Sequence, residues 1–75
     1  FNPSTKISWQ TPVCNWQILK IYDVLGTEIA TLIDEFKSAG KYEVDFDASG
    51  LPSGIYFYRL QAGSFTETRK LLLIK

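Results

Sequence analysis

The stretch "LPSGIYFYRL", residues 51–60, decides the fold of this 75-residue chain. Pro52 and Gly54 stand directly before a run of aromatic and branched residues, as at a turn that leads into a β-strand. The spacing from Leu51 through Gly54 to Tyr56 matches the tyrosine corner of Greek-key sandwiches, in which a tyrosine hydroxyl bonds back to the preceding crossover. We therefore predict that Leu51, Gly54 and Tyr56 form a structural corner.

Apolar and polar residues alternate in short segments on the N-terminal side of this corner. "KYEVDFD", residues 41–47, and "TKISWQ", residues 5–10, show the period of two that is typical of a half-buried strand. "NWQILKIYD", residues 15–23, is apolar on both faces, which predicts a central strand that is covered from two sides. Gly26 suits the positive φ of a short hairpin loop, so the next segment should run back antiparallel.

That next segment, "EIATLIDEFKS" at residues 28–38, admits two interpretations. Its larger apolar residues follow the i, i+3, i+4, i+7 spacing of an amphipathic helix, which the pattern alone favours slightly. They are Ile29, Leu32, Ile33 and Phe36. Against a helix, Thr27 has Ala30 instead of Glu or Gln three residues later, and Thr31 and Ile33 are β-branched. The residues themselves leave the choice open.

The last two apolar segments, residues 51–62 and 65–75, are predicted to form a hairpin around Gly63 and Ser64, because Gly-Ser suits a two-residue type II′ turn. Such a turn places Arg59 opposite Thr68. One additional loop residue would instead set Arg59 against Arg69, which is unfavourable. Five or six strands with at most one short helix predict a β-sandwich.

Composition excludes several classes of function. Eight basic and eight acidic residues cancel and form no block, so neither nucleic acid nor an anionic membrane is an expected partner. The longest apolar run, residues 71–74, is far shorter than the roughly 20 residues of a membrane span. The chain contains no histidine, which removes the usual general base and imidazole metal ligands. We expect a protein that is not an enzyme and has no catalytic residue, metal site or cofactor.

Three remaining features, the acidic segment at residues 45–50, the aromatic rings and Cys14, could have either a structural or a functional role. "DFDASG", residues 45–50, begins like a calcium loop, but Tyr56 occupies the position of its bidentate glutamate, so turn capping by Asp47 is preferred. Most aromatic rings are needed in so small a core, and Trp16 and Tyr22 are the candidates for a ligand platform. Cys14 cannot form an internal disulfide, and its role cannot be read from the sequence.

Four segments together resemble the C-terminal sorting domain of type IX secretion substrates, the immunoglobulin-like type A family. They are "FNPSTKISW", "LKIYDVLGTEIATLIDE", "AGKYEVDFDASGLPSGIYFYRLQAG" and "ETRKLLLIK". The order and spacing of "YDVLG", "LPSGIY", "YRLQAG" and a terminal lysine are specific to it. The family's usual Tyr-Pro-Asn-Pro-like lead is absent before Phe1. The immunoglobulin-like domain of flagellar hook-cap proteins shares "YDVLG" and "LPSGIY", but the lysine-rich last strand favours the sorting family.

The resemblance implies an all-β fold, a small immunoglobulin-like Greek-key β-sandwich of six or seven strands. Because the family has a strand at residues 28–33, it favours strand over helix there. It also implies that residues 1–75 are a single domain at the end of a larger secreted protein. Such a domain is a non-catalytic sorting signal that the type IX machinery recognises in the periplasm. A sortase-like peptidase often removes it, and the cargo becomes secreted or attached to the outer cell surface.

The family's motif positions fall on Asp23, Gly26, Gly54, Tyr56, Arg59, Gly63, Lys70 and Lys75. The residues that we expect to contact a partner lie in the last two strands and are Arg59, Lys70, Leu72, Ile74 and Lys75. The final apolar run suits either a core strand or an edge strand to which a partner can add. The alternative function is a structural or carbohydrate-binding accessory domain of an extracellular enzyme, which would use Trp16. The cargo, the receptor, cleavage and the oligomeric state stay open.

Overall fold

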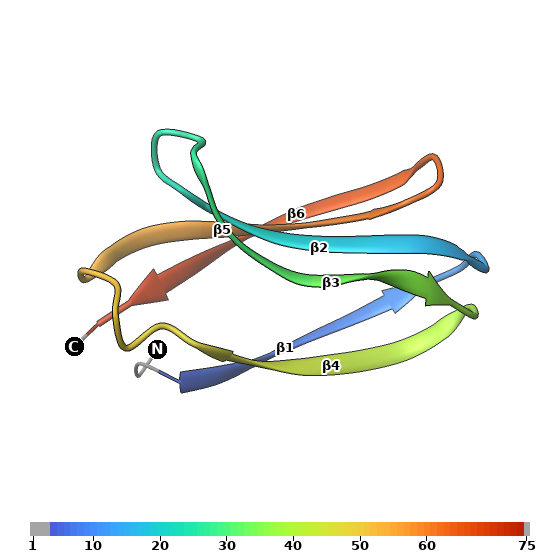
Figure 1. Cartoon of the computed structure of the whole chain (residues 1–75), viewed down its shortest axis with the longest axis horizontal. Coiled ribbons are helices and arrows are strands. Elements are labelled where there is room, and N and C mark those ends of the chain that lie inside the picture. The colour runs from blue at the N-terminus through green and yellow to red at the C-terminus, as the bar shows by residue number, and fades with distance from the viewer. Residues whose placement is uncertain (1–3, 75) are drawn as a thin grey trace.

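The computed structural model describes residues 4–74, which form two layers of β-strands without a helix (Figure 1). An antiparallel pair, β1 with β4, packs against a four-stranded antiparallel sheet of order β3-β2-β5-β6. The strands are β1 (Ser4–Thr11), β2 (Asn15–Asp23), β3 (Glu28–Lys37), β4 (Gly40–Asp47), β5 (Gly54–Ala62) and β6 (Phe65–Leu73). The predicted small immunoglobulin-like β-sandwich is therefore confirmed, with six strands in the described part of the chain.

The core lies between the two layers and is built mainly from alternate residues of β1, β2, β4, β5 and β6. Its buried members are Ile7, Trp9, Leu19, Ile21, Phe46, Ala48, Tyr56, Tyr58, Leu60 and Leu73. Burying one large apolar side chain stabilises the folded state by about 1.5–3 kcal/mol, so this single cluster supplies most of the driving force. β2 is a central strand, as predicted, but only its inner face is fully covered, because Ile18 on the outer face is half-buried. The expectation that two layers cover β2 is wrong.

Residues 28–37 form the edge strand β3, so the helical spacing is misleading and the strand prediction is confirmed. Two register shifts explain the spacing. Leu19 pairs with Ile33 but Lys20 with Thr31, and the next shift follows Ile21, so β3 has an extra residue at two places. A β-bulge sets two successive residues against one partner residue and interrupts the alternation. The partly buried apolar residues therefore occur in couples that mimic a helical face, Ile29 with Ala30 and Leu32 with Ile33.

The β5–β6 hairpin has the predicted two-residue turn and register. Arg59 pairs with Thr68, and Ala62 pairs with Phe65 on either side of Gly63 and Ser64. Gly63, the first central residue of the turn, has φ of 62°. Ser64, the second, has a negative φ, because no non-glycine residue among those described has a positive φ. A positive φ at the first central residue alone is characteristic of a type II′ turn. A Cβ atom at Gly63 would also lie 2.5 Å from Nδ2 of Asn15, so a glycine suits this position for two reasons.

The crossover from β4 to β5 carries the chain from the two-stranded layer to the four-stranded one (Figure 1). The hydroxyl of Tyr56 donates a hydrogen bond of 2.7 Å to the backbone oxygen of Pro52, and only 6% of Tyr56 is exposed. Leu51 packs partly buried against the core, and its N–H donates to the backbone oxygen of Ala48 at 3.0 Å. Gly54 begins β5 with φ of 154°. Leu51, Gly54 and Tyr56 thus lie together at one crossover.

Substituting Tyr56 with Phe should lower the free energy of unfolding by about 1 kcal/mol, because the partly buried hydrogen bond from its hydroxyl to the backbone oxygen of Pro52 is lost. Urea denaturation of the purified chain measures this change. Tyr22→Phe is the matched control, since the hydroxyl of Tyr22 makes no hydrogen bond within residues 4–74, and it should leave the midpoint unchanged. Equal midpoints for Tyr56→Phe and the parent chain would show that this hydrogen bond does not stabilise the crossover.

Candidate functional site

The exposed face of β5 and β6 collects most of the residues that the sequence suggested for partner contact. Tyr58 and Leu60 point into the core, so Arg59 between them points away from it. In the same way Lys70 and Leu72 point outward, because they alternate with Leu71 and Leu73. Ile74 follows β6 and is exposed, whereas Lys75 lies outside the described residues.

Cross-strand pairing arranges this face as three successive pairs. Ile55 pairs with Leu72, Phe57 with Lys70, and Arg59 with Thr68. We call these six residues the outer β5–β6 surface. Leu72 is 51% exposed and Ile55 is 41% exposed, so the surface has an apolar end and a basic end. Sequence reasoning missed Ile55 and Phe57, although the alternation along β5 was a signal that could have found them.

The final apolar run divides between core and surface. Leu73 is buried at 1% exposure and Leu71 is partly buried against the core, so these two side chains hold β6 to the other layer. Leu72 and Ile74 are more than half exposed. Alternation along one strand therefore lets the same four residues serve the core and present apolar side chains at the surface.

The outer β5–β6 surface carries positive charge that its surroundings do not neutralise. Lys20, which pairs with Arg59 across β2 and β5, binds Glu28 at 2.8 Å. The hydrogen bond and charge of each partner raise the pKa of Lys20 and lower the pKa of Glu28. Arg59 and Lys70 make no ion pair within residues 4–74. An acidic partner would complement these two cations.

The β2–β3 loop borders this surface and is held in a fixed shape. Figure 1 shows the loop rising from the four-stranded sheet on the side away from β1 and β4. Oδ1 of Asp23 accepts hydrogen bonds from the N–H groups of Leu25 and Thr27, both at 2.9 Å. Val24 and Leu25 are therefore presented to solvent, with Leu25 at 87% exposure. A hollow of about 300 Å³ runs from this loop to Phe57 and Arg59.

Trp16 and Tyr22, the suggested ligand platform, do not form one site. Trp16 is 52% exposed, and its indole N–H donates to Oδ1 of Asp34. Its cross-strand neighbour is the exposed Phe36. Tyr22 is half-buried and lies six positions further along β2, which is about 20 Å at roughly 3.3 Å per residue. The two rings cannot stack on one sugar.

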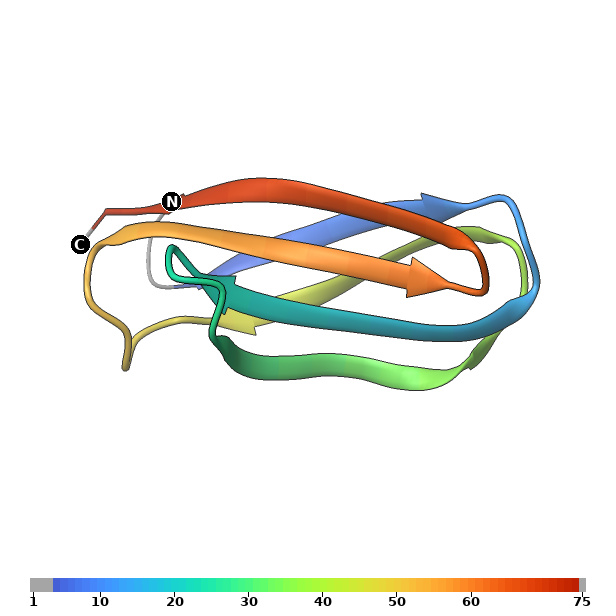
Figure 2. The ribbon, with the colours of Figure 1, turned by 90° about the horizontal axis from the view of Figure 1, so that it is seen from above.

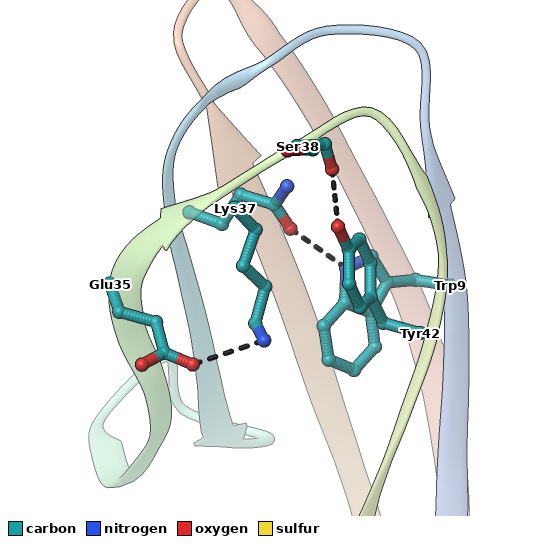
Figure 3. A network of polar contacts seen from close by, with 6 residues as sticks. Trp9, Glu35, Lys37, Ser38 and Tyr42 are labelled. Atoms are coloured by element: carbon teal, nitrogen blue, oxygen red, sulfur yellow. Dashed lines mark hydrogen bonds and ion pairs between the residues drawn. The ribbon is translucent and has the colours of Figure 1, made fainter.

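A polar network closes the sandwich at the β3–β4 turn (Figure 3). The indole N–H of Trp9 donates to Oε1 of Gln17 at 3.0 Å, and the hydroxyl of Tyr42 donates to the backbone oxygen of Ser38. Nζ of Lys37 lies 4.7 Å from the centre of the Tyr42 ring. Gln17 is fully buried, and its Nε2 has no hydrogen-bond partner within residues 4–74. These contacts position the rings between the layers and bring no nucleophile or acid–base pair together.

Outside this network, the other residues with possible chemical roles do not form a reactive or metal-binding site within residues 4–74. Oδ1 of Asp47 accepts a hydrogen bond of 3.0 Å from the N–H of Ser49, which caps the turn and lowers the pKa of Asp47. Residues 4–74 contain no group of three His, Cys, Asp or Glu side chains that could hold a metal ion. Sγ of the exposed Cys14 accepts a hydrogen bond from the N–H of Ala39 at 3.2 Å. Among the described residues, no helix is long and apolar enough to cross a membrane.

Comparison with known families gives one match. The model of the family described as "Secretion system C-terminal sorting domain" matches residues 2–75. No curated protein and no solved structure matches the chain. Except for Phe1, the match covers the four segments on which the resemblance rested, and it lends no support to an accessory domain that binds carbohydrate.

Replacing Asp23 with Ala should lower the free energy of unfolding by about 1 kcal/mol, because two loop N–H groups lose their acceptor. Urea denaturation measures the loss, and amide exchange at Leu25 and Thr27 should become faster. Asp23→Asn is the control, since it keeps Oδ1 as an acceptor and should retain most of the stability. If the asparagine variant were as unstable as the alanine variant, the charge of Asp23 and not its two hydrogen bonds would matter.

The pKa of Asp47 should lie below that of an unperturbed aspartate, because the N–H of Ser49 stabilises the carboxylate. A folded-state pKa below the unfolded value means that Asp47 stabilises the protein above the unfolded pKa. This contribution is lost as the pH falls through the folded pKa. An NMR titration of the Asp47 carboxyl carbon measures the pKa. Ser49→Ala keeps the backbone donor and should retain a lowered pKa, whereas an unshifted Asp47 in the parent chain would contradict the capping bond.

Proposed function

The chain belongs to the family of secretion system C-terminal sorting domains, and from this premise we propose that the type IX secretion machinery recognises the outer β5–β6 surface. The domain is a C-terminal sorting signal for cargo of the type IX system. The machinery recognises the domain, and the cargo attached on its N-terminal side is exported and becomes secreted or displayed on the cell surface. Domains of this family are in general not catalytic.

The observation that carries the proposal is the position of two unneutralised cations beside exposed apolar residues on one rigid face. Arg59 and Lys70 lie on neighbouring strands of a hydrogen-bonded hairpin, and Leu72 follows two positions after Lys70. A partner that buries Leu72 and Ile55 gains hydrophobic free energy, while a carboxylate placed near Arg59 and Lys70 sets the orientation. The complementary surface on the machinery is therefore apolar with acidic groups.

Two further residues extend this proposed surface beyond the strand pairs. Ile74 continues the exposed apolar end directly after β6 and is 61% exposed. Lys75, which lies outside the described residues, matches the family's terminal lysine and would add a third cation. Both are assigned to partner contact from their sequence position, and Ile74 also from its exposure.

We also propose how the domain acts during export of the cargo. Residues 1–75 act as one domain behind the cargo in a larger secreted protein, which the single hydrophobic core of residues 4–74 supports. The domain itself performs no chemistry. Recognition takes place in the periplasm, and a sortase-like peptidase then removes the domain, as the family resemblance implies. The native cargo would reach the outer surface only while the outer β5–β6 surface is intact.

Reversing the charge of both cations, in Arg59→Glu with Lys70→Glu, should leave the cargo in the periplasm and lower the exported amount about tenfold or more. Cell fractionation and immunoblotting of the native cargo protein in a type IX host measure this. Lys6→Glu on β1 is the control for each single reversal, because it changes one exposed lysine to glutamate on the opposite layer, and it should be exported normally.

Deleting residues 71–75 is the stronger variant, but it also removes the buried Leu73, so circular dichroism must check that the shortened domain still folds. Normal export of both the charge-reversed protein and the deletion protein would refute recognition through this surface. Loss of export in Lys6→Glu as well would indicate a nonspecific effect of charge.

A further inference from the structure

β6 has one side without a strand partner among residues 4–74. Within residues 4–74 it pairs only with β5. In a two-residue hairpin the residues that flank the turn exchange two hydrogen bonds, and such pairs then alternate along the ladder. Because Ala62 and Phe65 flank the turn, the backbones of Phe65, Glu67 and Arg69 bond to β5. The N–H and C=O groups of Thr66, Thr68 and Lys70 therefore point away from β5, toward the open edge.

The two edges of the four-stranded sheet differ in regularity. β3, at the other edge, contains both β-bulges, which twist a strand and interrupt its row of backbone groups. β6 pairs with β5 over nine residues without a register shift and contains no proline. Only the β6 edge therefore offers this sheet an even row of donors and acceptors. Lys70 belongs both to this row and, through its side chain, to the outer β5–β6 surface.

An open groove of about 880 Å³ lies directly beneath β6. It exists because a layer of two strands does not cover the whole inner face of four. Phe65, Glu67 and Arg69 of β6 line one wall, and Ser8, Trp9 and Gln10 of β1 line the other. Figure 2 shows that β1 and β6 run along the same long side of the sandwich. Side chains that point inward from a strand next to β6 would enter this groove.

On the basis of the function proposed above, we propose that an extended segment of the type IX machinery adds as a strand to the edge of β6 at Thr66, Thr68 and Lys70 and places alternate side chains in this groove. In such β-augmentation the main-chain hydrogen bonds provide affinity and the pockets for alternate side chains provide specificity. The segment carries an acidic residue on the outer side next to Lys70. Toward the groove it carries polar or aromatic residues.

The chemistry of the groove selects this partner over a purely apolar strand. Glu67 and Arg69 form an ion pair and both point toward the groove. Inward-pointing charges at a sheet edge oppose pairing with an arbitrary apolar segment, because such a segment would desolvate them without replacing their contacts with water. The ring of Tyr58 also lines the groove and can pack against an aromatic or polar side chain.

The test replaces one backbone donor at the edge. Thr68→Pro removes an N–H that points away from β5, and proline is tolerated on edge strands at such positions, so the domain should stay folded. Export of the native cargo protein should fall about tenfold or more, because the added strand loses a hydrogen bond and meets the proline ring. Thr68→Ala keeps the N–H and measures the effect of losing only the side chain from the outer β5–β6 surface, so its export should fall much less than that of Thr68→Pro. Arg69→Pro, which removes a bond to β5, should unfold the domain and thereby verify the register.

Amide hydrogen exchange provides a second readout with the purified cargo protein. In the free protein the amides of Thr66, Thr68 and Lys70 should exchange fast, and those of Glu67 and Arg69 slowly. Adding the detergent-solubilised outer-membrane complex of the type IX system should slow the edge amides about tenfold or more, as new hydrogen bonds form. Protection confined to β3, or no protection at the three edge amides, would overturn the proposal.

The outcomes separate this inference from the function on which it rests. Normal export of folded Thr68→Pro together with failed export of the Arg59 and Lys70 charge reversals would refute strand addition and leave recognition of the outer surface intact. Normal export of every variant would refute both. A concentration-dependent dimer that Thr68→Pro dissociates without affecting export would assign the edge to a second copy of the chain and overturn the proposal.

Discussion

The two-residue turn at Gly63 and Ser64 is the constraint on which the functional surface depends. It sets the register of β5 against β6, and a slip of one residue would exchange the inner and outer faces of a strand. In the observed register Leu73 is buried while Lys70 and Leu72 are exposed beside Arg59. The turn lies at the opposite end of the hairpin from the exposed Leu72, yet it determines what that end presents. The positive φ of Gly63 and its close approach to Asn15 make the turn specific.

Features that depend on neighbouring residues could be predicted from the sequence. The alternation in residues 41–47, the Gly-Ser turn and the spacing from Leu51 to Tyr56 each indicate a local structure, and the structure has a strand, a type II′ turn and a bonded crossover there. Family resemblance was needed for residues 28–37. Their apolar spacing is helical because two bulges double the inward-facing positions, and bulges arise from pairing with β2, which a single segment does not encode.

The candidate site was predicted less completely than the fold, because it depends on contacts between strands far apart in the sequence. Arg59, Lys70 and Leu72 were identified in advance, but their grouping with Ile55 and Phe57 follows from the β5–β6 register. The separation of Trp16 from Tyr22 follows from both lying along one extended strand. The groove beneath β6 could not be predicted, since it results from unequal numbers of strands in two layers. Side-chain type indicates which residues can bind, and only topology determines which of them meet.

The bulged edge of β3 has a consequence for chains that gather at high local concentration. Open-ended growth of a sheet requires that one lateral edge of a molecule match the opposite edge of the next, so that each added copy regenerates the same contact. Here the regular edge formed by β6 would have to pair with the edge formed by β3, where two β-bulges interrupt the row of backbone donors and acceptors. The mismatch prevents propagation from molecule to molecule. Folded copies waiting for export are thereby protected from fibre formation, even though one of their flanks is able to accept a strand.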